Sequence, residues 1–129
     1  MKKVMTSALL ISICVFIGLT GCSNNSAIKD EAFSPAKTVI SAVDEFLDGI
    51  IDIEAASNRA EEATEQLKKI EKTEANSDII ECSNDIAFSL SFNKLTGSAN
   101  TTAQDTAFKE TILENRNKLA KLIGEEERK

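Results

Sequence analysis

The three cysteines have the strongest capacity for covalent chemistry in this chain, because a thiolate is a nucleophile. Cys14 lies inside an apolar run, Cys22 directly follows that run, and Cys82 lies far downstream. Cys82 is a lone thiol without a basic partner, which makes it a poor catalytic nucleophile. It shares an apolar helical stripe with Ile79 and Ile86, so we expect it to be buried as a small hydrophobic residue.

Carboxylates are the other abundant reactive group, but the chain contains no His, no Tyr and no Trp. The absence of His excludes His-dependent triads and His-based zinc or di-iron sites. The sequence also has no Gly-rich phosphate loop. Carboxylate pairs such as Asp44/Glu45 and Glu61/Glu62 are typical of solvated helix faces. We therefore expect no enzymatic activity, no catalytic residue, no metal ligand and no cofactor.

The first 22 residues have the layout of an export signal. Lys2 and Lys3 precede an apolar run over residues 8–19, and the segment ends in Leu19-Thr20-Gly21-Cys22. This segment resembles the signal of bacterial lipoproteins, whose lipobox has the form Leu-x-Gly/Ala-Cys. The resemblance implies removal of residues 1–21 and attachment of a diacylglyceryl group to the Cys22 thiol, and in many members of that family N-acylation as well. Two or three acyl chains such as palmitate would hold the chain firmly on a membrane.

The resemblance also implies a location in the bacterial cell envelope. In Gram-negative members an Asp after the modified cysteine favours retention in the inner membrane, whereas this chain has Ser23 there. The expectation is the outer membrane, facing the periplasm, or the outer face of the cell membrane in a Gram-positive source.

Cleavage removes two of the 15 Lys and Arg and none of the 21 Asp and Glu, so the formal net charge changes from −6 to −8. This charge argues against nucleic-acid binding, which requires basic residues to neutralise phosphates. An unpaired Cys82 in an exported protein leaves a buried thiol or an intermolecular disulfide as alternatives.

The remaining chain reads as a short tether and one helical domain. Residues 22–34 are small and polar and predict a flexible lipidated tether. Ser34 and Pro35 predict a helix start, as cap and first helical residue. Apolar residues then recur at helical spacing to about residue 72, which predicts one long helix. A phase slip at Ser57-Asn58, with Glu61 completing a capping-box spacing, leaves a break there as the alternative.

Two further helices follow. The second is predicted to begin at Asn76 or Ser77 and to end at Gly97, and the third to begin at Thr101 or Thr102 and to end near Gly124. A charged tail over residues 125–129 completes the chain. The fold prediction is all-α: an antiparallel three-helix bundle over residues 35–124 with a long first helix.

The middle helix is apolar on two opposite faces. Cys82 and its neighbours share one face, whereas Phe88, Phe92 and Leu95 fall nearly opposite. Either the flanking helices cover both faces, or these three residues contact a protein partner or a second copy. The leading hypothesis is a membrane-anchored, non-enzymatic helical interaction module. The alternative is a carrier or sensor that holds a small apolar ligand between its helices.

Overall fold

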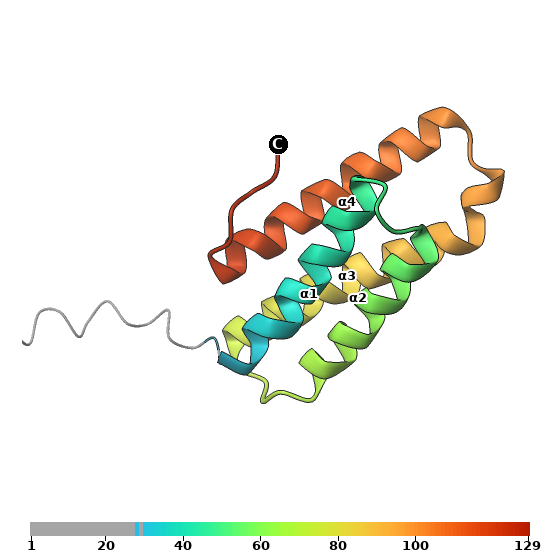
Figure 1. Ribbon diagram of the computed structural model, residues 1–129. Coiled ribbons are helices and arrows are strands. Elements are labelled where there is room, and N and C mark those ends of the chain that lie inside the picture. Colours follow the sequence, from blue (N-terminus) through green and yellow to red (C-terminus); the bar gives the residue numbers. More distant parts are fainter. Residues whose placement is uncertain (1–27, 29) are drawn as a thin grey trace, which may run out of the picture.

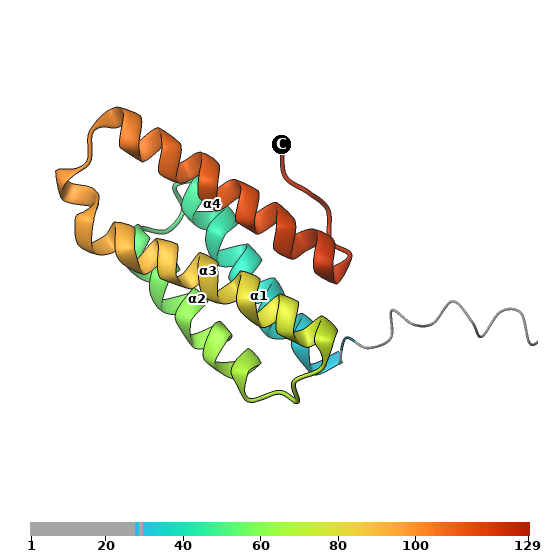
Figure 2. The ribbon, with the colours of Figure 1, turned by 180° about the vertical axis from the view of Figure 1, so that it is seen from behind.

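The computed structural model describes residue 28 and residues 30–129, which form four α-helices with a short 3-10 turn, η2, before the last. The elements are α1 (Asp30–Leu47), α2 (Ile53–Lys68), α3 (Glu74–Thr96), η2 (Gly97–Ala99) and α4 (Thr102–Ile123). Consecutive helices run antiparallel, and α1 packs against all three others (Figures 1 and 2). No strand occurs in this described part, which confirms the all-helical class. None of the described helices is long and apolar enough to cross a membrane.

The predicted single helix over residues 35–72 was wrong, and the bundle has four helices instead of three. The chain turns at Gly49, whose φ of 71° is in the left-handed region that favours glycine. The Ile50 N–H donates to the Glu45 carbonyl (2.8 Å), which closes α1 with the bond pattern of a Schellman motif. Asp52 then caps the first turn of α2 with its side chain.

The alternative break at Ser57-Asn58 was also wrong, because both residues lie inside α2. Ser57 is completely buried, and its hydroxyl donates to the Glu61 carboxylate one turn later (3.2 Å). The change in apolar phase therefore reflects two separate helices whose junction lies about six residues before the slip.

The start of α1 also differs from the prediction, because the helix begins at Asp30 rather than at Ser34-Pro35. Pro35 lies inside the helix and is buried, as is Ala32 at 1% exposure. A proline this close to a helix start removes only one backbone hydrogen bond, and burial of the first turns compensates for it. The last five residues of the expected tether thus belong to the bundle.

The predicted ends of the two later helices agree more closely with the structure. Thr101 caps α4 in a capping box with Gln104, and Gly124 ends it with a φ of 75°. Gly97 follows α3 as predicted. The start of α3 lies slightly earlier than predicted, because Thr73 is the cap and Asn76 is buried with its amide donating to the Glu71 carbonyl (2.9 Å).

The core lies between the four helices and consists of aliphatic side chains with many alanines. Fully or almost fully buried members come from every helix: Ala36, Val39 and Val43 from α1, Ala56, Ala60, Ala63 and Leu67 from α2, Ile79, Ile86 and Leu90 from α3, and Ile112, Leu119 and Ala120 from α4. Small side chains allow close approach of backbones, so α2 can fold back tightly on α1.

Ion pairs and hydrogen bonds tie α4, and the chain segment after it, to α1. Arg116, only 8% exposed, donates from Nε and Nη2 to both carboxylate oxygens of Asp44 on α1 (3.0 and 2.8 Å). Arg128 pairs with Asp48 and lowers the pKa of that carboxyl. Asn117 makes two further hydrogen bonds to the Arg128 backbone. These contacts hold the predicted charged tail against α1 and α4.

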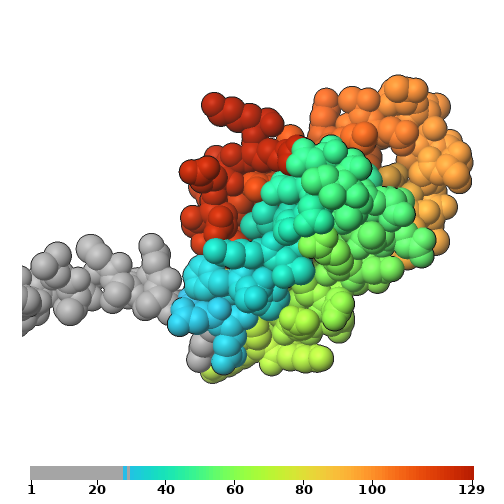
Figure 3. Space-filling view, in the orientation of Figure 1, coloured from blue at the N-terminus to red at the C-terminus, as the bar shows by residue number. Residues whose placement is uncertain are grey.

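One end of the bundle projects beyond the rest. No residue after Leu90 is buried until Ile112, so the end of α3, the η2 turn and the start of α4 form a hairpin with little core of its own. In the space-filling view this hairpin stands out from the neighbouring surface (Figure 3). The beginning of α1 lies at the opposite end of the bundle, beside the start of α3 and the end of α4 (Figures 1 and 2).

Candidate functional site

Phe88, Phe92 and Leu95 are the main exposed apolar residues of the described chain, and we call them the apolar triplet. They are 68%, 58% and 77% exposed, respectively. The two phenyl rings stack, with centroids 6.2 Å apart and planes inclined by 22°. Since exposed apolar side chains normally occur singly, an ordered cluster of three on one helix face is a candidate contact surface.

The apolar triplet lies on the face of α3 that points away from the core. Ile86 and Leu90 on the inner face are completely buried. Phe88 and Phe92 each lie two residues from Leu90, which places them roughly 160–200° around the helix from it. Neither α1 nor α4 covers this outer face, so the arrangement in which flanking helices bury both faces does not occur.

The outer face of α3 continues toward the helix start as a row of carboxylates. Glu74, Asp78, Glu81 and Asp85 precede the apolar triplet at alternating spacings of four and three residues, and all four are exposed. Among the described residues, none of the ion pairs involves any of the four. We call these four residues the acidic row. Sequence reasoning missed this row, although the heptad spacing that joins it to the triplet is visible in the sequence.

Ile50 is a fourth exposed apolar side chain, at 69% exposure, and it lies in the turn between α1 and α2. This turn is at the same end of the bundle as the triplet, because α1 and α3 run in the same direction (Figure 1). The exposed apolar residues therefore gather at the end of the bundle that is remote from the start of α1.

Cys82 is buried at 3% exposure, as its apolar stripe predicts. Its Sγ lies 3.5 Å from the Asn115 carbonyl oxygen of α4, and burial raises the pKa of the thiol. A protonated, enclosed thiol packs as part of the core and is a poor nucleophile.

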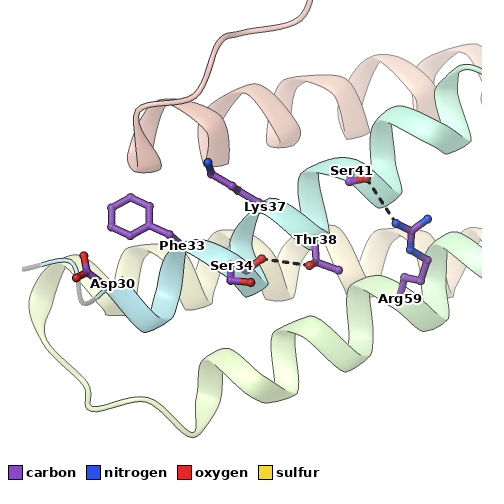
Figure 4. Close-up of a pocket in the computed structure, with 7 residues that line it drawn as sticks. All are labelled: Asp30, Phe33, Ser34, Lys37, Thr38, Ser41 and Arg59. Atoms are coloured by element: carbon purple, nitrogen blue, oxygen red, sulfur yellow. Dashed lines mark hydrogen bonds between the residues drawn. The ribbon is translucent and has the colours of Figure 1, made fainter.

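A shallow polar groove lies between α1 and α2 (Figure 4). Arg59 reaches across it from α2 to Glu45 (Nη2 to Oε1, 3.2 Å) and to the Ser41 hydroxyl (3.5 Å). The hydrogen bonds from Arg59 and Ser41 lower the pKa of the Glu45 carboxyl. These side chains satisfy one another, so the groove offers a ligand no free charge of theirs.

A second groove, of about 600 Å³, lies where α1 begins and α4 ends. Its lining is mostly apolar and includes Ile28, Phe33 and Leu122. Two exposed lysines, Lys118 and Lys121, also line the groove. Of the two grooves, it is the better suited to an apolar ligand.

The predicted lipid site, Cys22, lies outside the described residues, as do residues 1–27 and 29. In the described part no three His, Cys, Asp or Glu side chains are grouped so as to hold a metal ion. Comparison of the chain with protein-family models, with curated proteins and with solved structures finds no match.

Proposed function

We propose that this chain is a lipid-anchored protein of the bacterial cell envelope that acts as a non-enzymatic interaction module. The anchor is the acylated Cys22, and the contact surface is the apolar triplet on the outer face of α3. The observation that carries the proposal is the exposure of two stacked phenyl rings and a leucine on a helix whose opposite face is buried as far as Leu90.

Energetic reasoning supports a contact role for the triplet. Fully burying a Phe or Leu side chain is worth about 1.5–3 kcal/mol, and these three residues leave most of that free energy unused in the fold. Aromatic residues also dominate the binding energy of protein interfaces. A partner that covered the triplet would gain what the bundle does not.

The position of the triplet suits an anchored protein. Cys22 precedes the start of α1 by only eight residues, a span of at most about 28 Å. The apolar triplet lies toward the other end of the bundle, near the end of α3. An anchor at one end would therefore leave the triplet accessible from the space beyond the membrane.

Metabolic labelling with an alkyne fatty acid tests the anchor. The wild-type chain should be labelled and sediment with membranes, whereas Cys22→Ala should be unlabelled and any processed protein should be soluble. Cys82→Ala is the matched control, since loss of a buried thiol should not affect labelling. An unlabelled wild type, or a labelled Cys22→Ala chain, would refute the anchor.

Site-specific photo-crosslinking tests the contact surface. A photoreactive residue at position 92 should give a discrete adduct in the envelope of the producing cell, and the same residue at exposed position 62 on α2 should not. The adduct should vanish when Phe88→Ala is added. Equal adducts at both positions, or none at position 92, would contradict the proposal.

The groove at the start of α1 favours a second candidate function, a carrier or sensor of a small apolar ligand. Native mass spectrometry of protein extracted from its host tests it. A bound molecule of lipid size that is absent from the Leu122→Lys variant would support the carrier. Detection of the chain mass alone, with no bound molecule, would refute the carrier and leave the interaction module as the proposed function.

A further inference from the structure

We infer that the partner of the outer face of α3 is an amphipathic helix that carries apolar residues in one half and Lys or Arg in the other, packed antiparallel to α3. The inference rests on the proposed function and names its class of partner. It combines the apolar triplet with the acidic row into one continuous surface.

The spacing of this surface fits a helical partner. From Glu74 to Leu95 the seven residues follow intervals of four, three, four, three, four and three. This is the 3.5-residue period of a coiled-coil seam, and it is sustained over three heptads, about 32 Å of helix. The stripe drifts by about 20° per heptad around a straight helix, so a partner helix that follows it would cross α3 at about +20°.

The neighbouring side chains allow a helix to approach. Ser77, Asn84 and Ser91 flank one side of the stripe at heptad spacing, and none of them is large. The inner face of α3 is fixed by α1, α2 and α4. The outer face of α3 is not covered by another helix of the bundle. A further helix can therefore pack on it by the same ridge-and-groove rules that govern the packing of the four helices.

The charge of the stripe selects the composition of the partner. The four carboxylates of the acidic row are exposed and form no ion pair within residues 30–129. A partner with basic residues opposite them gains charge complementarity, whereas an acidic one is repelled. The apolar half of the partner must then lie opposite Phe88, Phe92 and Leu95.

The helix dipoles select the orientation. In an antiparallel arrangement the basic half of the partner is its carboxyl-terminal half, where cations are stabilised by the macrodipole. In a parallel arrangement the basic half would be the amino-terminal half, where cations are disfavoured. The antiparallel orientation therefore satisfies both the stripe and the partner helix.

A second copy of this chain fits the stripe less well. Parallel pairing would place the two acidic rows opposite each other. Antiparallel pairing centred on Phe92 would place each acidic row beyond Thr96, the end of the other α3, so the carboxylates would have no basic half of a helix opposite them. A bilayer with anionic lipid would likewise be repelled by the acidic row.

Binding of a designed peptide to the full chain in non-ionic detergent tests the inference. The probe is a three-heptad helical peptide with Leu at the seam positions of its first half and Lys at those of its second half. Fluorescence anisotropy should show binding that weakens as salt is raised from 0.05 to 0.5 M, about half a molar being enough to screen exposed charges. The same peptide with Glu in place of Lys, and the peptide with its halves exchanged, should bind at least about tenfold more weakly.

Matched charge reversals on the protein locate the contact. Glu81→Lys with Asp85→Lys should weaken binding of the Lys probe about tenfold or more, because two exposed pairs become two repulsions. Glu110→Lys with Glu114→Lys makes the same charge change at the same spacing on the exposed side of α4 and should leave binding unchanged. Circular dichroism of both variants checks that they fold.

The possible results separate the two proposals. If Phe92→Ala abolishes binding but the Glu81/Asp85 reversal does not, the contact surface stands and the basic partner is refuted. If neither change affects binding, or if both reversals weaken it equally, the peptide does not use the outer face of α3. A dimer in sedimentation that Phe92→Ala dissolves would replace the partner helix by a second copy. Adsorption of the chain to anionic vesicles through the same residues would also overturn the inference.

Discussion

Truncation of Phe92 should hardly destabilise the bundle, whereas truncation of Leu90 two residues earlier should destabilise it strongly. Phe92 is 58% exposed and Leu90 is completely buried. The covered two-fifths of the Phe92 ring contribute about 1 kcal/mol by area, and the stack with Phe88 adds about 0.5 kcal/mol. Alanine returns about 0.5 kcal/mol through its higher helix propensity. The expected loss for Phe92→Ala is therefore about 1 kcal/mol.

Leu90→Ala has no such compensation. It removes a fully buried side chain and leaves a cavity between the helices, at a cost of about 3–5 kcal/mol. Leucine and alanine differ little in helix propensity, so the whole cost remains. Urea unfolding of residues 22–129 carrying Cys22→Ser, followed by circular dichroism at 222 nm, measures both values in one assay. A loss of 3 kcal/mol or more in Phe92→Ala would show that the ring belongs to the core, and the contact surface would be refuted with it.

Three further predictions concern the fold. Because Cys82 is buried and burial raises its pKa, a maleimide should label it slowly in the native chain and quickly in urea, and a disulfide-linked dimer on a non-reducing gel would contradict this. Gly49→Ala should lower the unfolding free energy by about 1–2 kcal/mol in urea titrations, since it forces alanine into the left-handed region. Gly97→Ala, at a helical φ of −60°, should not lower it. Arg116→Ala should lower the thermal midpoint, because it removes the two charge-assisted hydrogen bonds to Asp44, worth about 1.5–3 kcal/mol, and leaves that carboxylate only the longer contact with Arg128 (3.5 Å). Lys37→Ala, which breaks an exposed pair, should shift it little.

The helix ends that the sequence predicted correctly for the expected reason are those of α4. Thr101 with Gln104 forms a capping box and Gly124 takes a left-handed φ, so local chemistry is sufficient to place both ends. Gly97 follows α3 as predicted, but its φ is helical and the chain continues there into η2. The burial of Cys82 also follows from its spacing to Ile79 and Ile86. Such features depend on neighbours in the chain and need no knowledge of the tertiary structure.

The turn at Gly49 could not be placed in the same way. A glycine inside a helix costs only about 1 kcal/mol, so its presence alone does not decide between a continuous helix and a turn. Packing decides it, because a break there lets the alanines of α2 lie against α1 and closes the bundle. The same reasoning explains Pro35, which is tolerated inside α1 because the turns around it are buried.

The contact surface was predictable in part. The spacing of Phe88, Phe92 and Leu95 placed them on one face, but only the packing of α1 and α4 shows that this face is uncovered. The acidic row could have been found from its heptad spacing. It was overlooked because exposed carboxylates are usual on any helix. A row of them indicates a contact surface only when the apolar triplet that continues it is known to be exposed.

The absence of buried residues between Leu90 and Ile112 has a consequence for motion. Amide hydrogens around Ile79 and Ile86 should exchange with solvent only when the whole bundle unfolds, whereas those from about residue 92 to residue 106 should exchange through local opening of the hairpin. Phe92 lies just past the point in α3 where the expected mechanism of exchange changes from global unfolding to local opening. A partner seated there would have to hold the hairpin closed, and part of its binding free energy would be spent on that ordering. Its arrival should therefore be visible as slowed exchange at the hairpin, well beyond the residues that it touches.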